Sequence, residues 1–204
     1  MKGCLINPLS RAVQEGKKAA ADNNVMHAKP DLRVFLKWMI AGSGSVIADV
    51  IRLEFMTTSD PNTYTRDEWK SLGFFYDRDD DARLWMLQGS KSGLKRFASL
   101  LRQYVTNPRR QLKSEHEHYG PYMYLKISTW PEAGIRKSAI RGTLDDLKRL
   151  ANIVDNKLDE TDVGKSVDVS LDYVDDPEYK LVLCVCADDT DPSSLDPLLA
   201  QNGG

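Results

Sequence analysis

The sequence predicts an α+β fold in which duplicated β-α-β units form a ferredoxin-like antiparallel sheet with two helices on one face. The first observation is an internal repeat, because residues 89–101 match residues 142–154 without a gap. Glycine, a hydroxyl residue, Leu-Lys-Arg, an apolar residue and alanine recur in register. The second observation is that each matched segment follows a strand pattern, opens a helix, and later reaches a strand that begins at Tyr122 or Tyr179. Two such units joined by a hairpin give the split β-α-β arrangement. Chance similarity between Leu/Lys/Arg-patterned helices is the alternative explanation of the repeat.

The helix that follows Gly89 is the clearest single element. Ser90 or Ser92 can cap it, and Asn107-Pro108 closes it, because the residue before a proline is biased out of the α region. Its apolar side chains form one stripe, which is typical of a helix with one buried face. The stripe consists of Leu94, Phe97, Ala98, Leu100, Leu101 and Tyr104.

The other elements of the expected domain, residues 56–187, follow from weaker patterns. A capping-box spacing at Thr65–Glu68 starts a short helix. Further elements are a strand at 83–88, a strand at 122–130, a turn at 131–134 with a hairpin strand at 136–141, and an extra edge strand inserted at 166–171. The two copies are therefore expected at 83–130 and 136–187, and residues 188–204 are expected to be a disordered tail.

Residues 1–55 are expected to be an N-terminal extension, partly helical or disordered. Residues 1–30 are polar and lack a sustained period, whereas Asp31 can cap a short helix with apolar residues at helical spacing. Met56 opens a polar stretch that looks like the beginning of a protein. We therefore treat Met56 as a hypothetical biological start, which intact mass measurement of the native protein would test.

Composition excludes several classes of protein. The chain has 204 residues, 41% hydrophobic and 28% charged, which is typical of a globular protein with a substantial core. A formal net charge of -2 provides no global attraction to nucleic acid or to membranes. Three cysteines, two of them in the apolar run 181–186, do not form a disulfide framework and fit a reducing cytosol. The apolar run 34–50 is too interrupted for a membrane span, so a cytoplasmic protein is expected.

Candidate chemistry is concentrated at His116-Glu117-His118. On an extended segment the two imidazoles project to the same side, where they could ligate a metal or act as a general acid or base. The structural alternative is a hydrogen-bonded pair that fixes the approach to the following strand. The second copy has no histidines at the corresponding place. No other catalytic constellation is recognisable, and no cofactor is predicted.

The strand at 122–130 places Tyr122, Tyr124 and Lys126 on one face. Such a face is similar to the stacking surface of an RNA-recognition sheet, but the basic-Gly-aromatic-Gly motif is missing, so no nucleic-acid partner is expected. Exposed tyrosines on an open sheet would also suit a homodimer that joins sheet to sheet.

The stretch from Leu87-Gln88-Gly89-Ser90, through 94–101, to His116-Glu117-His118 and Tyr124-Leu125-Lys126-Ile127 resembles small immunity proteins of bacterial polymorphic toxin systems. The resemblance covers roughly residues 83–130. It implies a cytosolic α+β protein that binds and neutralises a toxin and has no catalytic activity.

The expected function is therefore that of a non-enzymatic protein-binding factor of the immunity-like kind. Arginine and tyrosine are typical interface anchors. The expected partner-binding residues are Arg109, Arg110, His116, His118, Tyr122 and Tyr124. Two alternatives remain open: a metal- or histidine-dependent enzyme centred on His116 and His118, and a dimerising regulatory module.

Overall fold

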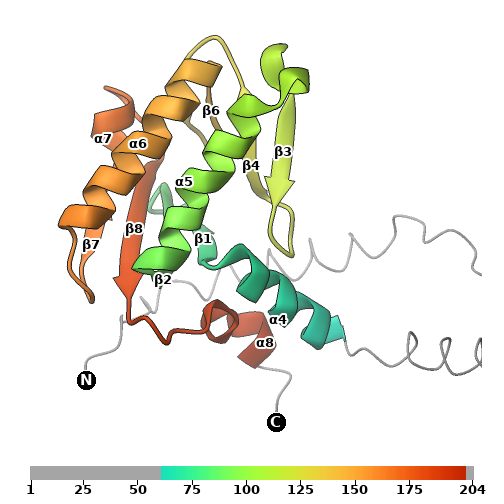
Figure 1. The fold of residues 1–204 in the computed structure, drawn as a ribbon, viewed down its shortest axis with the longest axis vertical. Helices are drawn as coiled ribbons and strands as arrows, with labels where there is room; N and C mark the ends of the chain where they lie inside the picture. Colours follow the sequence, from blue (N-terminus) through green and yellow to red (C-terminus); the bar gives the residue numbers. More distant parts are fainter. Residues whose placement is uncertain (1–60, 201–204) are drawn as a thin grey trace, which may run out of the picture. The chain divides into compact units, whose positions relative to one another are not determined.

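A computed structural model describes residues 61–200 (Figure 1). The extension expected at 1–55 and the proposed start at Met56 lie outside these residues. The helices are α4 (Pro61–Leu72), α5 (Lys91–Thr106), α6 (Leu144–Glu160), α7 (Ser170–Tyr173) and α8 (Pro197–Ala200), with short 3-10 helices η2 (Pro108–Gln111) and η3 (Pro192–Leu195). The strands are β1 (Phe75–Asp79), β2 (Leu84–Ser90), β3 (His116–Tyr119), β4 (Leu125–Thr129), β5 (Gly134–Ile135), β6 (Ile140–Gly142), β7 (Ser166–Asp168) and β8 (Lys180–Cys186).

The strands form two four-stranded sheets of mixed direction. Sheet A has the order β1-β2-β8-β7 and sheet B has the order β3-β4-β6-β5. The central pairs, β2 with β8 and β4 with β6, are parallel, and each outer strand is antiparallel to its neighbour. The α+β class is therefore confirmed. The single antiparallel sheet of a ferredoxin-like fold is not observed, since the central pairs are parallel and the strands divide between two sheets.

The two halves of the described chain have the same order of main elements. The first half runs β1-β2-α5-β3-β4 and the second runs β5-β6-α6-β7-β8. Sheet B, read from its β5 edge, is β5-β6-β4-β3, which repeats the pattern β1-β2-β8-β7 of sheet A. Each sheet therefore combines the first two strands of one half with the last two strands of the other. In Figure 1, α5 and α6 lie side by side over these strands.

Three expectations change in this topology. The predicted hairpin between the strands at 122–130 and 136–141 is absent, because β5 reverses the chain first and leaves β4 and β6 parallel. The segment expected as an inserted edge strand, β7, is the counterpart of β3, since each pairs antiparallel with the last strand of its half.

The third change concerns the register of the repeat. Gly142 lies opposite Thr129, and Gly89 lies opposite Val185. If Gly89 and Gly142 are equivalent, then the residues opposite them, Val185 and Thr129, are equivalent too. In that alignment Tyr179 corresponds to Met123 and not to Tyr122. A slip of one residue matters because it exchanges the two faces of a strand.

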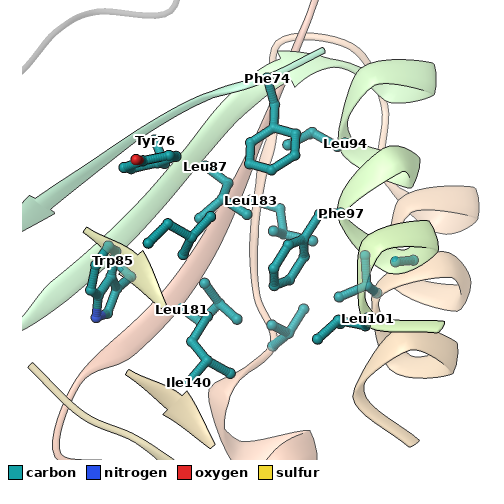
Figure 2. Packing of buried hydrophobic residues seen from close by; sticks show 14 of the residues in the cluster. Phe74, Tyr76, Trp85, Leu87, Leu94, Phe97, Leu101, Ile140, Leu181 and Leu183 are labelled. Atoms are coloured by element: carbon teal, nitrogen blue, oxygen red, sulfur yellow. The ribbon is translucent and has the colours of Figure 1, made fainter. Parts of the chain in front are cut away.

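The core lies between the helices and the inner faces of the sheets. Figure 2 shows Leu94, Phe97 and Leu101 of α5 directed toward Leu87 and Leu183 of sheet A. Four of the repeated apolar positions of α6, Leu147, Leu150, Ala151 and Val154, are also fully buried. The long helices form as predicted, because their apolar stripes have a sheet to cover.

The C-terminal segment differs from the expected disordered tail. Residues 192–195 form η3 and residues 197–200 form α8. Asp196 is 2% exposed, and its Oδ2 accepts hydrogen bonds from Trp69 Nε1 at 2.8 Å and from Tyr122 Oη at 2.7 Å. The buried Asp196 carboxylate thus anchors the C-terminal segment, and donors from aromatic side chains satisfy its hydrogen-bonding capacity.

Within residues 61–200, no helix combines the length and apolar character that crossing a membrane requires.

Candidate functional site

The histidine segment forms β3, an edge strand of sheet B. His116 lies opposite Ser128 of β4, and His118 lies opposite Lys126. Between them Glu117 lies opposite Ile127, which is fully buried. Since side chains alternate along a strand, both histidines project from the face that points away from the core. The prediction that they share one side is confirmed by this register.

Each imidazole is oriented by a backbone carbonyl. Nδ1 of His116 contacts the carbonyl oxygen of Ser114 at 2.9 Å, and Nδ1 of His118 contacts that of Met123. A carbonyl oxygen can only accept, so Nδ1 carries the proton in both rings and Nε2 holds the lone pair when a ring is neutral. The ring centroids are 5.2 Å apart in an edge arrangement. These contacts hold the two rings in fixed orientations on the edge strand.

Arg110 stabilises this edge strand from the core side, and its own side chain is largely buried. Its Nη1 donates to the carbonyl oxygen of His116 at 2.6 Å, and its Nη2 donates to Glu117 Oε2 at 3.2 Å. The guanidinium also lies over the ring of Tyr104, 5.4 Å from its centroid. Only 19% of its side chain is exposed. Arg110 therefore positions β3 and offers little surface to a partner, whereas Arg109 is exposed.

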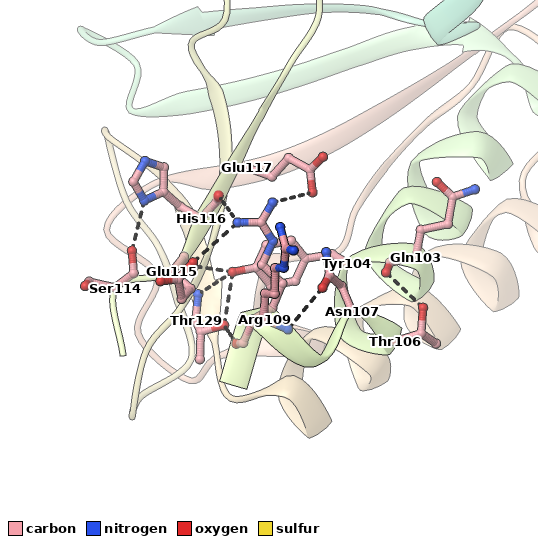
Figure 3. A network of polar contacts seen from close by, with 11 residues as sticks. Gln103, Tyr104, Thr106, Asn107, Arg109, Ser114, Glu115, His116, Glu117 and Thr129 are labelled. Atoms are coloured by element: carbon pink, nitrogen blue, oxygen red, sulfur yellow. Dashed lines mark hydrogen bonds and ion pairs between the residues drawn. The ribbon is translucent and has the colours of Figure 1, made fainter. Parts of the chain in front are cut away.

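The neighbouring network ties β3 to α5 (Figure 3). Tyr104 Oη donates to the carbonyl oxygen of Glu115 at 2.7 Å and accepts from the backbone N–H of Thr129 at 3.0 Å. The Thr129 hydroxyl donates to the carbonyl oxygen of Arg110 at 2.5 Å. These hydrogen bonds hold the histidine strand in a fixed position against α5.

Tyr122 and Tyr124 are not the open aromatic surface that the sequence suggested. The two rings are stacked 6.2 Å apart, and Tyr124 meets Tyr76 edge-on at 5.0 Å. Trp69 lies 5.9 Å from Tyr122. Burial and the Asp196 carboxylate raise the pKa of Tyr122 above its ordinary value, so its hydroxyl remains a donor. The strand begins only at Leu125, and both tyrosines are partly buried and pack against the aromatic core.

A row of residues in register crosses sheet B on its outward face. From β3 to β5 the row is His116, Ser128, Arg141 and Gly134, and each residue lies opposite the next. The opposite row, Glu117, Ile127, Ile140 and Ile135, faces the core, and its three isoleucines are fully buried. We call the outward surface the basic face. It consists of Lys113, His116, His118, Lys126, Ser128, Trp130, Arg136 and Arg141.

Two cations of the basic face lie over the ring of Trp130, and a third is paired with a carboxylate. Lys113 Nζ lies 4.6 Å and the Arg141 guanidinium 5.1 Å from the ring centroid of Trp130. Arg136 donates from Nη1 to Glu178 Oε2 at 2.8 Å. No carboxylate of residues 61–200 forms an ion pair with Lys113, Lys126 or Arg141.

The contributions of Trp130, Arg136 and Arg141 to the basic face were missed in the sequence. Lys126, Ser128 and Trp130 alternate with buried residues, which is a usable strand signal. Arg136 and Arg141 join them only because β5 and β6 pair beside β4, and β5 has two residues. So short a strand leaves no periodic pattern.

Two other features lie apart from this face. An open groove of about 460 Å³ between α4 and α5 is lined by Glu68, Leu72, Arg96 and Gln103, among others. It contains none of the predicted site residues. Among the residues that the structure describes, no three histidine, cysteine or carboxylate side chains come together as a metal site.

Comparisons of this chain with protein-family models, with curated proteins and with solved structures found no match.

Proposed function

We propose that this protein is a bacterial cytosolic, non-enzymatic factor that acts by binding another protein, in the manner of an immunity protein. The observation that carries the proposal is the basic face. It presents two oriented histidines and three cations without carboxylate partners among the described residues. An arginine on an aromatic ring, next to polar groups of a rigid sheet, has the character of an interface anchor.

The rigidity of the edge supports the same proposal. Arg110, Tyr104 and Thr129 fix β3 before any partner arrives, so little side-chain entropy would be lost on binding. Arg109 is exposed, and Met123, whose carbonyl oxygen contacts His118, is 50% exposed. Tyr122 and Tyr124 stabilise the hairpin of β3 and β4 from the core side. The matching element order of the two halves also supports an origin by duplication.

Affinity purification from the native host, followed by mass spectrometry, tests this function. Wild-type protein should retain a stoichiometric protein partner, and the variant His116→Ala/His118→Ala should lose most of it. A toxin encoded in the neighbouring gene would fit the immunity-like role. Recovery of no partner, with both proteins behaving alike, would contradict the proposal.

The histidine pair favours one second candidate, a metal-dependent or histidine-dependent enzyme. With Nδ1 of each ring donating to a carbonyl, each Nε2 is the basic nitrogen that a metal prefers. Elemental analysis of the purified protein separates the candidates. Stoichiometric metal that disappears in His116→Ala would favour the enzyme, and metal-free protein would remove its metal-dependent version.

A further inference from the structure

The basic face contains two buried N–H groups that no acceptor satisfies. Arg136 Nε and Arg141 Nε are both inaccessible to solvent and have no hydrogen-bond partner. A buried donor without an acceptor is unfavourable and uncommon in folded proteins, so each such group needs an explanation. Both belong to guanidinium groups, whose planar edges match carboxylate oxygens.

The two guanidinium groups converge on one place in the sheet. Gly134 lies between them, directly opposite Arg141 and two residues before Arg136. A Cβ atom at Gly134 would be 3.2 Å from Arg141 Nε and 3.4 Å from Arg136 Nε. Both Nε atoms therefore lie against the backbone at Gly134, which brings the two guanidinium groups together on this face. The glycine lets both arginines lie against the sheet backbone.

Further donors and charges surround this point. Ser128 is the next residue in the row beyond Arg141, and His116 follows it. Lys126 and Lys113 add positive charge without a carboxylate partner among residues 61–200. Glu178 accepts a hydrogen bond from Arg136 Nη1, and 38% of the Arg136 side chain is exposed. The face thus has more donors and more positive charge than its own acceptors satisfy.

We propose that the basic face binds an acidic segment of a partner protein, with Arg136 and Arg141 as its carboxylate anchors. This inference rests on the proposed protein-binding function and names the chemistry of the partner. Charge complementarity selects carboxylates, and paired arginines can hold them in a bidentate manner. A single-stranded nucleic acid is the weaker fit, because base stacking needs an open aromatic ring. Trp130 already carries Lys113 and Arg141 on its ring.

Binding of an oligoglutamate peptide to the full chain tests the inference by calorimetry. Wild-type protein should bind the peptide, with an affinity that falls as salt is added. Arg136→Gln and Arg141→Gln should each weaken binding by about tenfold, because a hydrogen bond to a charged group contributes about 1.5–3 kcal/mol. Lys148→Gln is the matched control, since Lys148 is an exposed cation on α6, away from this face. It should bind like wild type.

The variant Arg141→Lys distinguishes loss of the planar guanidinium group from loss of folding. It keeps the charge and the contact with Trp130, so it should fold normally yet bind the peptide more weakly than wild type. If Lys148→Gln and Arg141→Gln weakened peptide binding equally, the effect would come from net charge alone. That result would overturn the inference. Binding of an oligonucleotide in preference to the peptide would also overturn it, as would no binding of the peptide at all.

The host purification distinguishes failure of this inference from failure of the proposed function. If a partner is recovered and Arg136→Gln/Arg141→Gln retains it, the protein-binding function stands and the acidic-segment inference falls. If no partner is recovered but the peptide binds with the expected variant pattern, the anion site stands and the protein-binding function falls.

Discussion

Ser90 and Thr143 cap the two long helices through the same contact. The side-chain oxygen of each accepts a hydrogen bond from the backbone N–H three residues later, at 3.1 Å in both cases. Each residue follows the glycine of its copy, Gly89 or Gly142, at the end of a central strand. The two halves therefore start their helices in the same way, although their corresponding strands lie in opposite sheets.

Replacing either cap with alanine should destabilise the protein by about 1 kcal/mol. Thr143→Ala should cost slightly more than Ser90→Ala, since Asp146 Oδ2 accepts hydrogen bonds from both the backbone N–H and the hydroxyl of Thr143 in a complete capping box. Urea unfolding monitored by circular dichroism measures both. Ser99→Ala is the control, because this exposed hydroxyl lies within α5 and caps nothing. A loss in Ser99→Ala as large as in the cap variants would contradict this explanation.

The two long helices, α5 and α6, were predictable because their signals are local. The shorter helices were not: α4 begins at Pro61, before the capping-box spacing at Thr65–Glu68, and α7 begins within the segment expected as a strand. A cap, an apolar stripe and a terminating proline all lie within one segment, as between Ser90 and Pro108. The position of Ser90 as cap is confirmed. The pairing of strands depends on residues far apart in the sequence, such as Gly89 with Val185, and no local pattern encodes it.

The candidate site was predictable only where it follows one strand. Alternation along β3 was enough to place His116 and His118 on one side. It could not show that Arg110 turns inward to bind the His116 carbonyl, or that Tyr122 meets Asp196. Those contacts follow from tertiary packing, which overrides what the amino-acid types alone suggest.

Asp196→Ala should destabilise the protein by about 3 kcal/mol. The substitution leaves the indole N–H of Trp69 and the hydroxyl of Tyr122 buried without their acceptor. It also frees the C-terminal segment that the carboxylate anchors. Urea unfolding gives the stability, and the fluorescence of Trp69 reports the local change. Asp189→Ala, an exposed carboxylate in the same segment, should be close to neutral. Equal stabilities of the two variants would refute the anchoring role.

Acid should weaken the contact between the β1–β2 turn and the β5–β6 loop. Partial burial raises the pKa of Asp80, but hydrogen bonds from Arg78, Lys137 and Tyr179 outweigh it and lower the pKa from 3.8 to about 2. A lowered pKa in the folded state stabilises the protein above the unfolded value, and this stabilisation is lost as the pH falls through the folded value. The stability advantage of wild type over Asp80→Asn should therefore be complete above about pH 4 and disappear toward pH 2.

Thermal unfolding across this range measures the Asp80 effect. With 34% of its side chain exposed, Asp80 is screened by water, so the advantage should be modest and should shrink further in salt. Asp81→Asn provides the control, as an exposed carboxylate in the same turn. A pH profile of Asp80→Asn that runs parallel to wild type would exclude the proposed linkage.

Separating the two halves should abolish folding of each and permit folding of the mixture. A cut between Glu132 and Ala133 falls between β4 and β5, and Glu132 is exposed. Each sheet needs strands from both sides of this cut, because β2 pairs with β8 and β4 pairs with β6. A half alone therefore lacks the central partner of both its long strands, and the faces that α5 and α6 cover remain incomplete. Circular dichroism should show little structure in either fragment and a native-like spectrum after mixing. A fragment that unfolds cooperatively on its own would show that β2 can pair in parallel with β4 of its own half, and the exchange of strands between sheets would then be one of two available arrangements.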